Sequence, residues 1–312
     1  MLKPSLLISL FLLAFVLPLS AQEKDSTDIW EDWGDEDNTE CTTSHGRDYG
    51  FMQFHSFGGK PTIELTYGNS NVGIKSFGKL SQRDFANVGS AELRLSYSRL
   101  EDYDDYIVRY RNRFFFVSNN STDLVSKKGT ASDISSDLWR FGFGTQDGYG
   151  YKIGSSAIVP YTSNSFVWSR VDWDLPEGGT LPGMTAEDQN RLDLFNNAFR
   201  FGSMTEGGVK LQIVPLFTLN AGYERSVIFP RYLVWKQLGS LAVEAAALGL
   251  ADMFAGEVMD SSPAAGPIIN FLLKSGVSYA VYQLRREKMN WPFNSAEPLT
   301  YDTWKIGMTF TF

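Results

Sequence analysis

The residues best placed for side-chain catalysis are His55 and Ser56, because a serine nucleophile with a histidine base and a carboxylate is the machinery of a hydrolase. Glu64 or Glu92 would supply the carboxylate. Adjacent residues of a strand point to opposite faces, however, so His55 and Ser56 would not meet directly. His45, the other histidine, lies in the lead-in segment. This geometry favours two ordinary histidines, and a lipid-modifying hydrolase that uses His55 stays an alternative.

Other binding chemistry has weaker support. The acidic run 35–38 lacks the spacing and central glycine of a calcium loop. The glycines of 142–144 and 148–150 lack the lysine-serine ending and following helix of a phosphate loop, so strand glycines are the simpler interpretation. Cys41 is the single cysteine, which excludes an internal disulfide and a multi-cysteine zinc site. We therefore expect no enzyme activity, no metal and no cofactor.

Three arginines, Arg109, Arg111 and Arg113, occupy every second position of the segment 106–116, opposite apolar residues. Strict alternation of this kind predicts a strand. A packed sandwich core could not hold such a row, whereas a barrel lumen can if acids such as Glu92 pair with it. An anion-preferring lumen is the functional alternative, but pairing with lumen acids is favoured.

The same alternation recurs along most of the chain. It is strict at 91–97, 138–144, 209–213, 217–224 and 301–312, and weaker at 48–57, 61–68, 71–78, 149–158 and 163–173. Charged polar faces and aromatic apolar faces favour an all-β, antiparallel transmembrane barrel of about eight to twelve strands, with a soluble β-sandwich as the alternative. The predicted lumen-lining residues are Glu92, Arg94, Arg109, Arg111, Arg113, Arg140, Lys210, Glu224 and Lys305.

The charge of the chain is concentrated in one short segment. The 312 residues carry a net charge of −8, and residues 22–40 alone hold nine acids and one base, so the rest is nearly neutral. We expect the acidic segment 22–47 to be a disordered spacer. The alternative is a calcium-binding arm or an arm that docks a periplasmic partner through Trp30 and Trp33. Without a basic face, nucleic acid is not an expected partner.

The N-terminus predicts export. Lys3 precedes an apolar run at 6–19 and the small pair Ser20-Ala21, which is typical of a signal peptide, 1–21, cleaved before Gln22. An apolar run of about 14 residues is too short to span a membrane as a helix. We therefore expect a cleaved signal and a mature chain outside the cytoplasm.

The segment 232–289 breaks the period-two pattern. Apolar residues recur there at three- and four-residue spacing, which predicts a helix, a turn near Pro263 and a second helix from Pro267 to about Lys288. Lys236, Glu244 and Asp252 interrupt the first helix, so we expect neither helix to span the membrane alone. The hairpin is predicted to plug or cap the barrel mouth, or else to pack on itself in an outer loop. A further short helix is predicted to begin at Thr185.

The last strand carries the most specific signal. Its apolar residues alternate up to the terminal phenylalanine, at Trp304, Ile306, Met308, Phe310 and Phe312. This strand resembles the closing strand of Gram-negative outer-membrane β-barrels. The resemblance implies recognition by the barrel-assembly machinery, contact with outer-membrane lipid and lipopolysaccharide, and a location in the outer membrane.

The barrel prediction covers 48–312, including the helical insertion. The favoured function is that of a non-enzymatic integral outer-membrane barrel with a structural, binding or narrow transport role. The alternatives are a lid-gated channel for small or apolar solutes and the outer-membrane lipid hydrolase.

Overall fold

A computed structural model describes residues 59–78, 84–125, 134–174 and 184–312. The predicted signal peptide, the acidic segment, the strand at 48–57, both histidines, Ser56 and Cys41 lie outside these residues.

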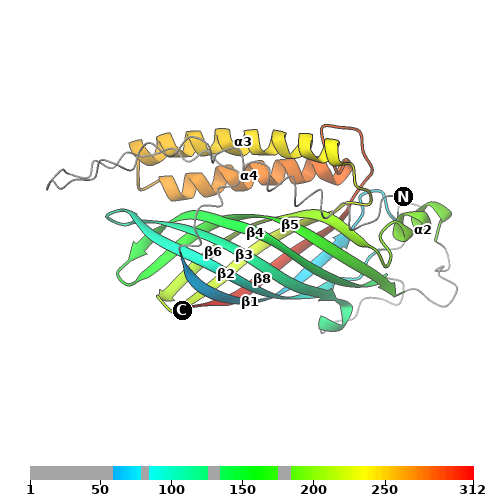
Figure 1. The fold of residues 1–312 in the computed structure, drawn as a ribbon, viewed down its shortest axis with the longest axis horizontal. Coiled ribbons are helices and arrows are strands. Elements are labelled where there is room, and N and C mark those ends of the chain that lie inside the picture. The colour runs from blue at the N-terminus through cyan, green and yellow to red at the C-terminus, as the bar shows by residue number, and fades with distance from the viewer. Residues whose placement is uncertain (1–58, 79–83, 126–133, 175–183) are drawn as a thin grey trace, which may run out of the picture. The chain divides into compact units, whose positions relative to one another are not determined.

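The described residues form eight antiparallel strands that close into one barrel in chain order (Figure 1). The eight strands are β1 (Lys60–Gly73), β2 (Val88–Asp104), β3 (Ile107–Ser121), β4 (Ser135–Ile153), β5 (Ser156–Asp174), β6 (Phe199–Val214), β7 (Phe217–Ile228) and β8 (Leu299–Thr311). The register between β1 and β8, with Leu65 opposite Met308, closes the barrel. The predicted all-β barrel is confirmed, with the smallest strand number expected.

Each strictly alternating segment of the sequence falls, to within one residue, inside one of these strands. Among the weaker segments, 71–78 runs past the end of β1, and 149–158 crosses the turn between β4 and β5. That turn holds Gly154 at φ +63°, a conformation that favours glycine in a two-residue hairpin. Such short turns join β2–β3, β4–β5 and β6–β7 at one end, which we call the short-turn end. The opposite, long-loop end carries the longer connections.

The long-loop end of the interior is filled by apolar side chains. They include Phe85 and Trp173, whose rings lie 5.5 Å apart, and Leu192 of the helix α2 (Ala186–Asp193). Thr185 caps α2 as predicted, its hydroxyl accepting a hydrogen bond from the Asp188 amide at 3.2 Å. A short 3₁₀ helix, η1 (Thr122–Leu124), follows β3.

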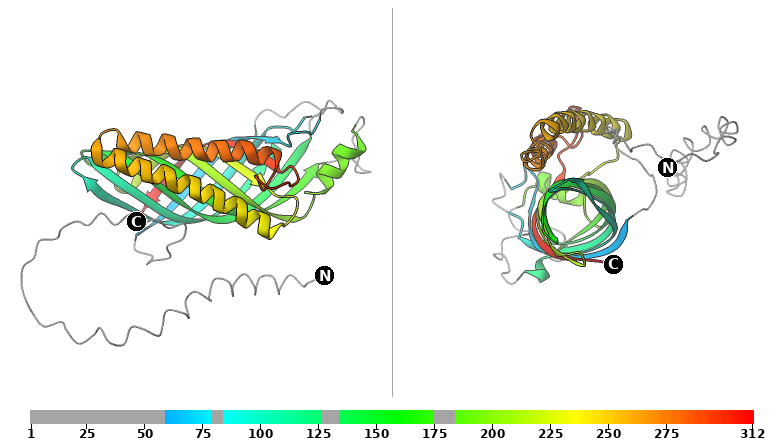
Figure 2. Two further views of the ribbon diagram at one scale, coloured as in Figure 1. Left: turned by 90° about the horizontal axis from the view of Figure 1, so that it is seen from above. Right: turned by 90° about the vertical axis from the view of Figure 1, so that its left-hand side faces the viewer.

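The helical insertion lies along the outside of the barrel. It consists of α3 (Val234–Ser261) and α4 (Gly266–Glu287), which pack against each other, and α4 contacts strands β4 to β7 (Figure 1). The end-on view of Figure 2 places both helices outside the ring of strands. The expectation of a plug or lid at the barrel mouth is therefore wrong, and the helices do not merely pack on each other in a loop. The interior has no room for helices because the barrel's own side chains occupy it.

Candidate functional site

A cluster of charged side chains crosses the barrel interior. It contains four acids and four bases from six strands, and each residue is at most 4% exposed. The members are Glu64, Glu92, Arg94, Arg140, Glu206, Lys210, Glu224 and Lys305. Because the charges balance, the cluster is electrically neutral. We call it the interior network.

Arg94 connects one half of the interior network. Its guanidinium lies 2.6 Å from Glu92, 2.6 Å from Glu206 and 3.3 Å from Glu64. The same group lies over the ring of Phe114, 4.6 Å from the centroid. The planar guanidinium can satisfy several carboxylates at once, which a lysine cannot do with the same geometry.

Lys305 connects the other half. Its ammonium lies 3.1 Å from Glu92, 3.1 Å from Glu206 and 2.5 Å from Glu224. Arg140 pairs with Glu224 at 2.6 Å. The last strand is therefore tied to strands β2, β6 and β7 through one side chain.

The remaining members and their neighbours complete the network. Lys210 pairs with Glu64 at 2.7 Å, and Thr309 donates a hydrogen bond to the same carboxylate at 3.0 Å. The hydroxyl of Tyr161 donates to Glu206. A Cβ at Gly208 would lie only 2.8 Å from that hydroxyl, so glycine is what admits the tyrosine.

The interior network has consequences for both stability and permeation. Removing one partner of a buried ion pair leaves an uncompensated charge and costs about 3–5 kcal/mol. An eight-stranded barrel has an interior just wide enough for side chains, and here paired charges occupy it. Apolar clusters lie beside it on the interior, with Phe114 and Phe116 packed on Val167.

Six of the nine predicted lumen residues lie in the interior network: Glu92, Arg94, Arg140, Lys210, Glu224 and Lys305. Prediction missed Glu64 and Glu206. Glu64 stands in a weakly alternating segment and was considered only as a hydrolase carboxylate. Glu206 precedes the strict alternation at 209–213, and the small residues around it gave no apolar contrast to mark a face.

The arginine row points the other way. Arg109, Arg111 and Arg113 are half-buried on the outer wall near the short-turn end, while Phe114 and Phe116 point inward. The expectation that these arginines line the lumen is therefore wrong. Alternation defines two faces without saying which is inside, and here aromatic packing fills the interior.

The arginine row takes part in an exposed ion cluster. Arg111 pairs with Glu101 at 2.7 Å, which also pairs with Arg99 at 3.1 Å. Arg109 lies 4.0 Å from Asp147. Arginines at this position suit the polar edge of a membrane better than its hydrocarbon core.

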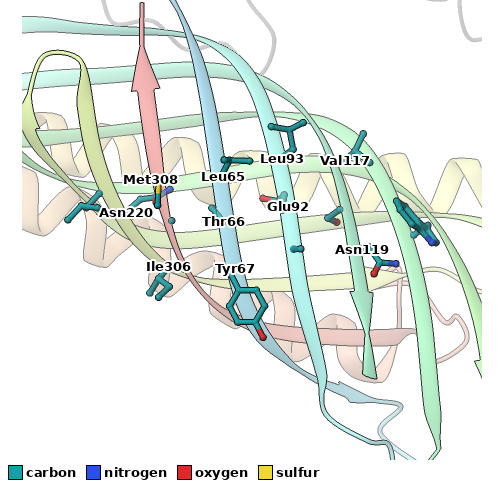
Figure 3. A pocket seen from close by; sticks show the side chains of 15 residues that line it. Leu65, Thr66, Tyr67, Glu92, Leu93, Val117, Asn119, Asn220, Ile306 and Met308 are labelled. Carbon is teal, nitrogen blue, oxygen red and sulfur yellow. The ribbon is translucent and has the colours of Figure 1, made fainter. Parts of the chain in front are cut away.

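One large part of the outer wall is apolar and uncovered. We call this the bare face, and it comprises Ile63, Leu65, Tyr67, Leu93, Leu95, Phe115, Val117, Phe141, Ile306 and Met308, all exposed. Figure 3 shows several of these side chains on β1, β2, β3 and β8 around a hollow of about 860 Å³. Most of the outward side chains there are apolar, with few polar groups to orient a ligand, so we interpret the hollow as wall surface rather than as a ligand cavity.

The predicted assembly-signal residues of the last strand all carry apolar side chains on or next to this face. Trp304 and Ile306 are 67% and 68% exposed, Met308 and Phe312 are also exposed, and Phe310 is half-buried. An isolated outward apolar side chain needs no explanation, but a continuous belt of this size indicates contact with something other than water.

Catalytic chemistry gains no support from the described part of the chain. His55, Ser56 and His45 lie outside it. Among the residues that the structure describes, no three of the His, Cys, Asp and Glu side chains are grouped in a way that could hold a metal ion.

No protein-family model and no curated protein matches this chain. Solved structures with similar folds include Neisserial surface protein A, at 10% sequence identity and a TM-score of 0.36 over 81% of this chain and 97% of that one. The attachment invasion locus protein Ail of Yersinia pestis matches at 9% identity and a TM-score of 0.33 over 81% and 99%. OprG from Pseudomonas aeruginosa, an outer membrane protein, matches at 9% and 0.26 over 81% and 96%.

These values are low, so the class follows from the chain's own strand order, closure and side-chain alternation. The protein is a closed eight-stranded antiparallel barrel of the outer-membrane type. It is distinguished by a helical insertion, α3 and α4, before its last strand.

Proposed function

We propose that this protein is a non-enzymatic integral outer-membrane barrel whose interior is closed to solutes, with a structural or binding role. The observation that carries the proposal is the interior network, in which eight buried charged side chains neutralise one another across the barrel. A conducting lumen would need a continuous water-filled path lined by polar groups.

The outer wall supports the membrane location. Its bare face is apolar and rich in aromatics, as lipid-facing walls of such barrels are. Short turns at one end and long connections at the other also fit this class, in which short turns face the periplasm. The lid-gated channel loses its main support, because the proposed lid lies along the wall.

The test is a planar-bilayer recording of purified full-length protein that has first been shown to fold. We expect no steady ion conductance from the wild-type chain. The variant Arg140→Ala/Glu224→Ala removes one neutral pair but leaves the apolar filling of the long-loop end, so we expect it to remain silent as well. Steady wild-type conductance would overturn the closed interior and favour the channel.

A further inference from the structure

The outer wall carries a stripe of polar side chains, whereas a lipid-facing surface requires apolar ones. The register places Thr145 opposite Asn164, Asn164 opposite Thr205, Thr205 opposite Arg225, and Arg225 opposite Asp302. With Asp147 and Thr162, which pair in the adjacent row, these residues form what we call the polar seam, crossing β4 to β8. Charged side chains on the lipid face of a barrel are destabilising, most strongly near the bilayer midplane.

Helix α4 lies over the polar seam from Asp147 to Asp302, and Thr145 at the edge of the seam stays exposed. Lys274 pairs with Asp147 at 2.9 Å, and the Tyr282 hydroxyl donates to Asp302 at 2.5 Å. The guanidinium of Arg225 lies 5.3 Å from the ring centroid of Tyr279. The helix therefore meets the seam at both ends and in between.

A glycine in the wall lets the helix come close. Gly207 faces α4, and a Cβ there would lie 3.2 Å from the Ser275 hydroxyl and 3.7 Å from the Phe271 ring. Any larger side chain would push the helix outward. Where α4 lies, the wall is therefore polar and also has a small residue that lets the helix pack closely.

The helical pair is polar inside and apolar outside. Its buried side chains include Gln237, Ser240, Glu244, Asn270, Lys274, Ser278 and Arg285. Its outward side chains include Trp235, 85% exposed, and Leu250, 68% exposed, with Phe254 and Leu272 also exposed. A surface helix in water shows the reverse arrangement, so this pattern indicates that hydrocarbon surrounds the pair.

The three charges that interrupt α3 before its last two turns are bonded, while Glu257 and Asp260 lie in those exposed last turns. Lys236 donates to the Asn294 carbonyl at 2.7 Å, Glu244 pairs with Arg285 at 2.8 Å, and Asp252 pairs with Lys274 at 2.8 Å. By length and composition alone, α3 is long and apolar enough to cross a membrane. Pairing is the form in which a membrane helix tolerates charge, and Asp252 is paired even though its side chain is 46% exposed.

Both helices are long enough to cross a bilayer. At 1.5 Å per residue, the 28 residues of α3 span about 42 Å and the 22 residues of α4 about 33 Å, against a hydrocarbon core of about 30 Å. The hairpin tip reaches the short-turn end, where the Tyr151 hydroxyl donates to the Ala264 carbonyl at 2.7 Å. The pair thus runs the depth of the barrel wall from the long-loop end.

We infer that α3 and α4 form a membrane-embedded helical pair, held on the polar seam and exposing its outer face to lipid acyl chains. The inference rests on the proposed outer-membrane location. The occupant of the outer face is lipid because the bare face of the same barrel exposes apolar side chains in the same way and both helices are long enough to cross the hydrocarbon core. A hairpin folded into water would leave Trp235 and Leu250 uncovered.

The test uses the full-length protein with Cys41→Ser and one introduced cysteine carrying a small environment-sensitive fluorophore. Leu250→Cys reports on α3, Leu93→Cys on the bare face, and Asp105→Cys on a short turn exposed to water. Each protein is placed in phosphatidylcholine vesicles whose acyl chains are brominated near the middle. We expect emission at position 250 to be quenched as strongly as at 93, and emission at 105 to remain.

The other outcomes are distinct. Quenching at 93 without quenching at 250 would overturn the inference and leave the barrel in the membrane. If the unlabelled Leu250→Cys protein then reacts with a membrane-impermeant maleimide, the hairpin faces water, and if it does not, another protein covers it. Absence of quenching at 93 would overturn the proposed function itself.

Discussion

The barrel wall buries polar side chains on both of its faces, but it encloses them by different means. The interior network is enclosed by the closed ring of strands, so it is sealed once β1 pairs with β8. The polar seam, apart from exposed Thr145, is covered by α4, a separate element that packs on the wall. Polar side chains of the outer wall are therefore buried only where another element covers them, whereas those of the interior are buried by closure of the barrel alone.

The largest single-residue effect should come from the interior network. Arg94→Met leaves three carboxylates without their shared partner and should lower the free energy of unfolding by about 3–5 kcal/mol. Urea unfolding in detergent micelles measures this. The control is the double variant Arg94→Met/Glu206→Gln, whose loss should be smaller than the sum of the single losses. Simple additivity would contradict a coupled network.

Charge placed on the outer surface should separate lipid-facing from water-facing positions. Leu93→Arg and Leu250→Arg should each lower the free energy of unfolding by about 2–4 kcal/mol in vesicles, because both positions would face hydrocarbon. Asp105→Arg, in a turn, is the control and should be nearly neutral. If Leu250→Arg is as neutral as the turn variant, the outer face of the helical pair does not contact lipid.

The contact between α4 and the seam should have an intermediate effect. Lys274→Met leaves Asp147 and Asp252 without their shared cation, and we expect a loss of about 1–3 kcal/mol. Asp147 is partly exposed and lies near Arg109, so the loss should stay below that of Arg94→Met. Hydrogen exchange of the α4 amides should rise while that of β1 and β2 stays constant. An equal rise in hydrogen exchange in α4 and in β1 and β2 would contradict the view that α4 covers the seam independently of the closed ring of strands.

The smallest effect should come from the exposed ion cluster near the short-turn end. Arg99→Ala removes a pair with Glu101 in which both side chains are well exposed. Such pairs contribute about 0.2–1 kcal/mol, and salt screens them. In urea unfolding, with or without added salt, the free energy of unfolding of this variant should differ from that of the wild type by no more than this amount. A loss as large as that of Lys274→Met would mean that this cluster is shielded from water.

The strands were largely predictable, because alternation alone marks segments such as 217–224 and the final strand. Which face of each strand points into the barrel was harder to predict. In β3 the arginines and the aromatics alternate equally well whichever set is inside, and the choice depends on where the hydrocarbon ends. Near the short-turn end an arginine on the outer wall meets a polar edge, while the interior needs aromatic volume.

The location of the hairpin could not be read from its periodicity. Spacing identified the helices and Pro267 located the start of the second, but the polar stripe that holds α4 is spread over five strands. Thr145, Asn164 and Thr205 are unremarkable in sequence and become a stripe only through the register. Three charges in α3 then appeared to forbid a membrane helix, because their partners on α4 and the 291–298 connection were not visible.

The central claim is that this chain forms a closed barrel in the outer membrane. The most direct test compares boiled and unboiled full-length protein from the outer-membrane fraction on a detergent gel. We predict recovery in that fraction and a clear mobility shift on boiling. Recovery in the soluble periplasm, with the same mobility before and after boiling, would contradict both the membrane location and the lipid-facing role of the bare face.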